Sequence, residues 1–197
     1  YYLLAWGLAS GIFRIGMPVI QTYSPFFTEL FSKKQLIKLD NEYLFVNKLI
    51  NLLIIPISIT IFYNSLIILK IWTQNNEVAN NSYEFLSLLV IGSALCICSY
   101  PSLSYLYCKK ITISLIYLNV FILPFLVISH IYFIDNLGAL GAAYVYLFYG
   151  ILYYLLTLLF VVKESNINFF IKILSNFLFC SFITYITNFL VIKFLFN

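Results

Sequence analysis

Residues 1–27 read YYLLAWGLASGIFRIGMPVIQTYSPFF. This apolar run is long enough to cross a bilayer, which takes roughly 20 predominantly apolar residues in a helix. Arg14 stands near the middle of the run. A cation at the bilayer centre costs on the order of 3 kcal/mol unless it faces a bundle interior or a water-filled cavity. The stretch therefore predicts a membrane-spanning helix with one face turned toward a polar cavity.

Helical periodicity gathers the small and polar residues of this stretch on one stripe. The stripe consists of Gly7, Ser10, Gly11, Arg14, Pro18, Gln21 and Pro25. Each proline removes a backbone donor, and such breaks persist in membranes where neighbours or water satisfy the freed carbonyls. We interpret the stripe as the lining of a cavity. A second interpretation stays open, in which Arg14 pairs with a carboxylate elsewhere in the protein or reaches the headgroups.

Composition sets the class of protein. The chain is 63% hydrophobic and 9% charged, with a mean hydropathy of +0.99, whereas soluble domains carry roughly 25% charged residues. We predict an all-α integral membrane protein. Its length accommodates about six spans with short loops. Because the sequence starts at Tyr1 inside an apolar run, we expect a piece of a longer protein whose missing part is N-terminal.

The apolar runs predict six spans. They cover residues 1–27, 49–69, 85–107, 111–134, 138–162 and 169–192. We therefore divide the chain into a five-span unit, residues 1–162, and an additional C-terminal helix within 163–197. Residues 28–48 resemble a short interfacial amphipathic helix. The polar segment 73–82, which lacks periodicity, is predicted to be an external loop.

Lysines set the predicted orientation. They gather in three alternate connections, as Lys33, Lys34, Lys38 and Lys48, then Lys109 and Lys110, then Lys163 and Lys172. The other connections hold only Lys70 and the terminal Lys193. Positive loops remain in the cytoplasm, so both chain ends are predicted to lie outside.

Signals of catalysis are weak. The single histidine, His130, has no nucleophile and orienting group at useful spacing, and neither phosphate-loop pattern occurs. Cysteines at positions 96, 98, 108 and 180 stand in or beside apolar runs, as small buried residues do, so we predict no metal site. No basic run suggests nucleic acid. We expect no cofactor and no enzymatic activity.

The polar residues at membrane depth favour binding of an anionic, hydroxyl-rich ligand. No acid stands mid-span, whereas one cation, several amides and many tyrosines do. Arginine binds phosphate oxygens bidentately, and aromatic faces stack on sugar rings. The candidate cavity-lining residues are Ser10, Arg14, Gln21, Asn51, Asn64 and Tyr100.

Several spaced residues resemble a known family. They are Tyr2, Ala5, Pro18, Gln21, the run Pro25-Phe-Phe-Thr-Glu-Leu30, a lysine loop ending near Tyr43, Pro56, Leu69, Trp72, Gly92 and the run Leu137-Gly-Ala-Leu-Gly-Ala-Ala143. Over about residues 1–162 this order resembles the C-terminal half of bacterial polysaccharide transporters, the O-antigen and capsule repeat-unit flippases. These are similar to MATE-type multidrug exporters and lipid II flippases. The resemblance implies two six-helix lobes around a cavity with alternating access, and Arg14 fits its cationic lining.

The resemblance also implies a function and a place. The protein would flip undecaprenyl-pyrophosphate-linked oligosaccharides across the bacterial cytoplasmic (inner) membrane, for O-antigen of lipopolysaccharide or for capsule. Its partners would be this lipid-linked substrate, membrane lipid and the polysaccharide polymerase machinery. Two alternatives stay open, a MATE-type small-molecule exporter and a membrane glycan polymerase or ligase. A polymerase would be expected to have a large external loop with arginines, and residues 73–84 contain none.

Overall fold

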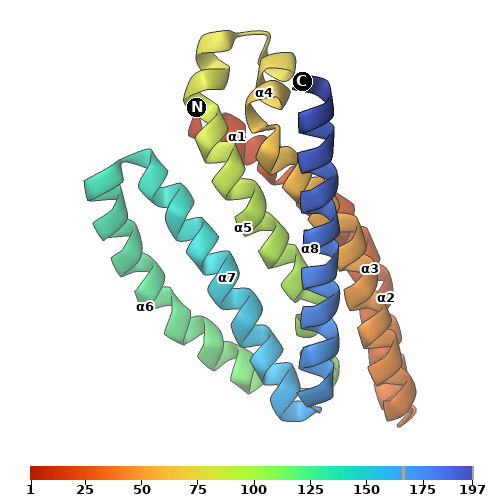
Figure 1. Cartoon of the computed structure of the whole chain (residues 1–197). Coiled ribbons are helices and arrows are strands. Elements are labelled where there is room, and N and C mark those ends of the chain that lie inside the picture. Colours follow the sequence, from red (N-terminus) through yellow and green to blue (C-terminus); the bar gives the residue numbers. More distant parts are fainter. Residues whose placement is uncertain (166, 197) are drawn as a thin grey trace.

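The structure, a computed structural model, describes residues 1–165 and 167–196, with all side chains except those of residues 114, 167–170 and 189–196. Every regular element among these residues is an α-helix (Figure 1). The helices are α1 (Tyr2–Ala9), α2 (Gly11–Ser32), α3 (Leu36–Tyr63), α4 (Ser65–Thr73), α5 (Asn76–Cys108), α6 (Thr112–Leu137), α7 (Ala139–Glu164) and α8 (Ile167–Phe196).

Among the described residues, five stretches are long and apolar enough to cross a membrane. They are Tyr2–Ser32, Leu36–Tyr63, Asn76–Cys108, Leu115–Leu137 and Ala139–Glu164. The 30-residue α8 adds another long, apolar helix. The chain is therefore an all-α, multi-pass membrane protein of about six helices, which confirms the predicted fold class.

Successive long helices run in opposite directions, so alternate connections share one end of the bundle (Figure 1). We call one of these ends the lysine end. It holds the turns at residues 33–35, 109–111 and 165, with Lys33, Lys34, Lys109 and Lys110 in or next to them. The opposite end holds α4, the α6–α7 turn, the start of α1 and the end of α8. These four lysines thus share one end of the bundle, as predicted, whereas Lys48 of the same predicted group lies inside α3. The side of the membrane that this end faces stays a prediction.

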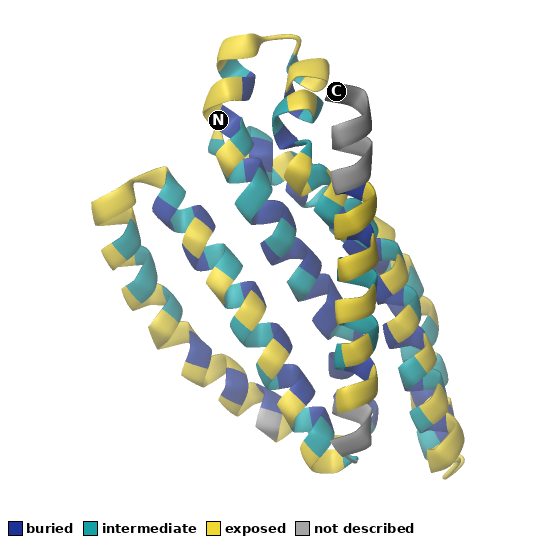
Figure 2. Ribbon diagram, in the orientation of Figure 1, coloured by how far each residue is buried: buried dark blue, intermediate teal, exposed yellow. Residues whose placement is uncertain are grey.

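Helix α5 is the centre of the bundle. It packs against α1, α2, α3, α4 and α7, and Figure 2 shows buried residues along much of its length. It approaches α7 closely where two glycines meet. A Cβ added to Gly150 would lie 2.7 Å from the carbonyl oxygen of Gly92, so the two backbones touch there. Small residues permit such approaches in membranes, where close packing rather than a hydrophobic force holds helices together.

The prediction of a short interfacial helix at residues 28–48 is wrong. Helix α2 continues to Ser32, and α3 begins at Leu36 and extends through Tyr63. The reason is a continuous apolar stripe, since Leu39, Tyr43, Val46 and Ile50 follow helical spacing and are all fully buried. The lysines of this region lie at the helix ends or on the exposed side of the same long helix.

Three other boundaries differ from the predictions. The first predicted span is broken at Ser10 into the two helices α1 and α2. The second predicted span is also broken, because α3 ends at Tyr63 and α4 begins as a separate helix at Ser65. The predicted external loop 73–82 is wrong, because α5 already begins at Asn76. Asn75 caps this helix by accepting hydrogen bonds from the backbone N–H groups of Glu77 and Val78. Ala79, fully buried, continues the core into that region.

The later helices match their predicted spans within a few residues. Helix α6 extends through the predicted turn at 135–137 and ends at Gly138, whose φ of +60° suits glycine. Helix α8 contains the predicted sixth span and packs mainly against α3.

The orientation can be tested with two introduced cysteines in a cysteine-free background. Lys34 and Asn76 are both exposed and lie at opposite ends of the bundle. We expect an impermeant thiol reagent added to intact cells to label Asn76→Cys and not Lys34→Cys. Labelling of both from outside, or of Lys34→Cys alone, would contradict the cytoplasmic placement of the lysine end.

Candidate functional site

The polar stripe of α1 and α2 faces away from the bundle core. Gly7, Arg14, Pro18, Gln21 and Pro25 are exposed, while Ser10 and Gly11 are partly exposed. A Cβ added to Gly7 or Gly11 would meet nothing within 4 Å. The opposite side of the same helices is buried, at Ala5, Ala9, Ile12, Gly16, Ile20 and Phe27. The stripe is therefore free to line a cavity.

Arg14 has no carboxylate within ion-pair distance among the described residues, whose one ion pair joins Lys33 and Glu29. The interpretation in which Arg14 pairs with a carboxylate thus finds no partner in the described part of the chain. Its guanidinium keeps all five N–H donors available for a ligand or water. Carboxylates and phosphates are the ligands that fit such a fork in a bidentate geometry.

The prolines of α2 add acceptors to the same stripe. Because proline has no N–H, Pro18 and Pro25 cannot donate the usual helical hydrogen bonds to the carbonyls of Arg14 and Gln21. Both affected carbonyls belong to residues of the exposed polar stripe. In a membrane, such carbonyls need another polar partner. The backbone, like the side chains, thus favours a hydrated surface here.

An aromatic wall borders this stripe. We define it as Trp6 of α1, Phe13 of α2, Tyr100 of α5 and Tyr146, Tyr149 and Tyr153 of α7, all of them half-buried. Ring centroids are 4.9 Å apart for Trp6 and Tyr146, 6.3 Å for Tyr146 and Tyr149, and 5.3 Å for Tyr149 and Tyr153. Phe13, next to Arg14 in the chain, lies 6.3 Å from Tyr100.

The wall combines aromatic faces with hydroxyl groups. The hydroxyls of Tyr146 and Ser93 lie 3.3 Å apart, joining α7 to α5. Such a surface offers stacking and hydrogen bonds without charge. A sugar, with apolar ring faces and hydroxyl edges, matches both properties.

The structure places four of the six predicted lining residues at this surface, Ser10, Arg14, Gln21 and Tyr100, and two elsewhere. Asn51 is fully buried on the packed side of α3, and neither amide atom has a hydrogen-bond partner among the described residues. Asn64 lies at the break between α3 and α4, where its amide donates to the Thr60 carbonyl at 2.9 Å. Neither belongs to the surface that contains Arg14.

The burial of Asn51 gives a stability prediction. A buried amide without partners costs about 1–3 kcal/mol, so Asn51→Leu is expected to raise the free energy of unfolding by about 1–2 kcal/mol. Asn64→Leu, which removes a hydrogen bond at a half-exposed helix end, serves as the matched control and is expected to bring no gain. Thermal unfolding in detergent measures both. A loss of stability in Asn51→Leu would mean that its amide has partners in the folded protein.

Sequence reasoning missed four members of the aromatic wall, Trp6, Phe13, Tyr146 and Tyr153. The signal was present in part, because positions 146, 149 and 153 repeat at helical spacing and so share one face. The sequence pattern does not predict which face of α7 packs against α5, because that depends on the tertiary packing.

The surface presents one cation, a side-chain amide and aromatic hydroxyl groups. Among the described residues no group of three His, Cys, Asp or Glu could hold a metal ion. His130, on α6, has its Nδ1 3.0 Å from the Leu126 carbonyl of its own helix. No protein-family model, curated protein or solved structure matches the chain.

Proposed function

We propose that this chain is one lobe of a two-lobe transporter that flips lipid-linked oligosaccharides across the bacterial cytoplasmic membrane. The observation that carries the proposal is the exposed polar stripe around Arg14, bordered by the aromatic wall. In this account, a second lobe faces the stripe, and the space between them is the cavity. The lysine end lies in the cytoplasm.

The two parts of the surface suit the two parts of such a substrate. The Arg14 guanidinium would bind the pyrophosphate, which carries the charge that must not enter the bilayer core. The aromatic wall would contact the sugars through ring faces and hydroxyls. The polyisoprenoid chain needs no polar site and would stay in the surrounding hydrocarbon.

Movement of the substrate would require the cavity to open to each side in turn. Uniformly tight binding would oppose release, so a surface of neutral hydroxyls with a single cation suits transport better than a dense cluster of charges would. No acidic residue lies in the middle of a predicted span. Arg14 therefore meets the anionic ligand without competition from carboxylates of its own surface.

Removal of the protein from cells distinguishes the proposed function from its alternatives. For a flippase we expect loss of surface polysaccharide and accumulation of single lipid-linked repeat units. A polymerase or ligase would instead leave repeat units exposed on the outer leaflet. Normal polysaccharide with a changed sensitivity to small toxic compounds would point to an exporter and contradict the proposal. The measurements are lipid-linked oligosaccharide extraction, leaflet-specific labelling and growth with toxic compounds.

A further inference from the structure

A cavity of about 510 Å³ lies at the lysine end, between the α2–α3 turn and the α5–α6 turn. Its apolar lining is Phe31, Leu36 and Cys108. Two lysines, Lys34 and Lys110, line it from the two turns. The cavity thus joins an apolar wall to cationic groups contributed by segments far apart in the sequence.

Both lysines occupy the same position in similar turns. Lys34 has a φ of 56° and Lys110 a φ of 61°. After α2, the N–H of Lys34 donates to the Phe31 carbonyl and that of Gln35 to the Leu30 carbonyl, and the same pattern follows α5 at Lys110 and Ile111. This is a common helix ending in which the left-handed residue is usually glycine. The fixed turns hold both lysines at the helix ends.

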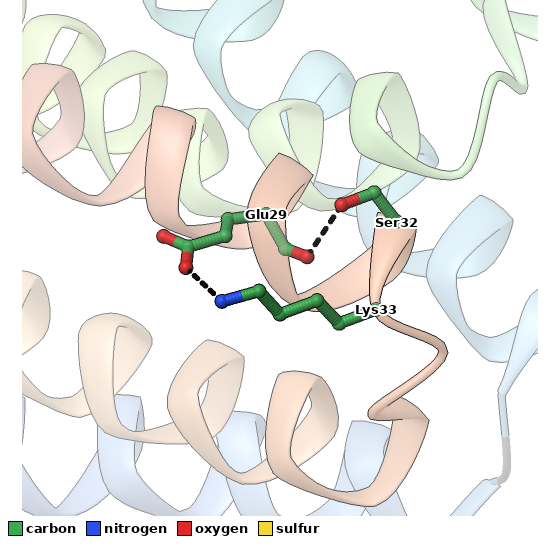
Figure 3. A network of polar contacts seen from close by, with 3 residues as sticks. All are labelled: Glu29, Ser32 and Lys33. Atoms are coloured by element: carbon green, nitrogen blue, oxygen red, sulfur yellow. Dashed lines mark hydrogen bonds and ion pairs between the residues drawn. The ribbon is translucent and has the colours of Figure 1, made fainter.

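The charges of the two lysines are not neutralised within the described residues. Glu29 forms an ion pair with Lys33, whose Nζ lies 2.6 Å from the Glu29 Oε1 (Figure 3). Asp40 accepts a hydrogen bond from the Tyr105 hydroxyl at 2.6 Å. No carboxylate lies within ion-pair distance of Lys34 or Lys110 in the described part of the chain.

A second cavity, of about 780 Å³, adjoins the first and shares Lys34 and Leu36 with it. Its other lining residues include Lys38 and Ile37, whose side chain is 82% exposed. Exposed apolar side chains beside cations, at the end of membrane-spanning helices, match the boundary between headgroups and acyl chains.

We propose that the cavity between the two turns binds an anionic phospholipid of the cytoplasmic leaflet. Lys34 and Lys110 contact the headgroup phosphate, and Phe31, Leu36 and Cys108 contact the first part of an acyl chain. Basic pockets between membrane helices at the cytoplasmic side are suited to anionic headgroups. The apolar lining selects a lipid over a free anion. This inference depends on the membrane fold and the charges, and it is independent of the proposed transport function.

The test measures lipid binding by the whole protein, purified in a neutral detergent. The thermal unfolding midpoint is recorded against rising amounts of phosphatidylglycerol or phosphatidylcholine. We expect only phosphatidylglycerol to raise the midpoint, since a ligand bound to the folded state stabilises it. In the double variant Lys34→Gln/Lys110→Gln, the phosphatidylglycerol concentration required should increase roughly 30-fold, the size expected for two lysine charges at an anionic membrane surface.

Two controls make the result specific. Lys70→Gln, on α4 at the opposite end, should respond to phosphatidylglycerol like the unchanged protein. Lys34→Arg/Lys110→Arg should retain binding, which shows that the Gln variant lost charge and not fold. An unchanged response in the Gln variant, or equal stabilisation by phosphatidylcholine, would overturn the proposal. Stabilisation by inorganic pyrophosphate that the Gln variant loses would also overturn it, because the cavity would then hold a free phosphate compound.

Discussion

Arg14→Ala is expected to abolish surface polysaccharide while the amount of protein in the membrane stays unchanged. The side chain is exposed and has no carboxylate partner among the described residues, so its removal leaves no unpaired group in the bundle. A bidentate contact with phosphate comprises two charge-assisted hydrogen bonds, of about 1.5–3 kcal/mol each. Their loss corresponds to binding weaker by on the order of 100-fold or more.

The matched variant for this prediction is Arg14→Lys. It keeps the charge but replaces a planar fork with a single ammonium group, so partial recovery of polysaccharide is expected. Membrane abundance is measured in the same cells. A parallel fall of abundance and polysaccharide in Arg14→Ala would indicate that the arginine holds helices together. Normal polysaccharide at normal abundance would show that the stripe does not meet the substrate.

Gly150→Leu is expected to remove most of the folded protein from the membrane. A Cβ at this position would lie 2.7 Å from the Gly92 carbonyl oxygen and 3.2 Å from its Cα, both of which are backbone atoms that cannot move aside singly. Helices α5 and α7 would have to separate along the largest helix contact of the bundle. Overpacking of this kind costs about 3 kcal/mol or more, a large part of the 5–15 kcal/mol that typically stabilises a protein.

Gly11→Leu is the control for Gly150→Leu, because a Cβ at Gly11 meets nothing within 4 Å. Its abundance and thermal unfolding midpoint should equal those of the unchanged protein. Equal losses in both variants would show that the effect comes from replacing any helical glycine. Normal abundance of Gly150→Leu would contradict the close approach of α5 and α7.

The long apolar helices followed from the sequence, whereas the breaks at Ser10 and Asn64 and the ends of α2, α3 and α5 did not. Apolar runs such as 111–134 and 138–162 are long, so a membrane helix was the clear interpretation, and α6 and α7 match them. The prediction for residues 28–48 was wrong because their lysines suggested a helix that lies on the membrane surface. A helix end can carry lysines and still span, since their long side chains reach the headgroups. The buried stripe through Leu39 and Tyr43 was the better guide.

The candidate site followed from the sequence only within one helix. Arg14 and Gln21 share the exposed face of α2 by helical spacing alone, and the partly exposed Ser10 lies at the N-cap of the same helix. Asn51 is also polar and at membrane depth, but its direction depends on where the neighbouring helices pack, and it is buried. Likewise the contact of Phe13 with Tyr100, and of Trp6 with Tyr146, joins separate helices. The spacing of residues along one helix does not predict contacts between helices.

The most direct test of the central claim is the leaflet in which the lipid-linked oligosaccharide accumulates. Intact right-side-out spheroplasts, in which the polymerase is absent, are treated with periodate, which does not cross the membrane and oxidises exposed sugars. Cells with the unchanged protein are expected to present repeat units to periodate, and cells with Arg14→Ala are expected to keep theirs protected until the membrane is opened. Equal oxidation in intact spheroplasts with and without the protein would contradict the claim that this chain carries the substrate across the membrane.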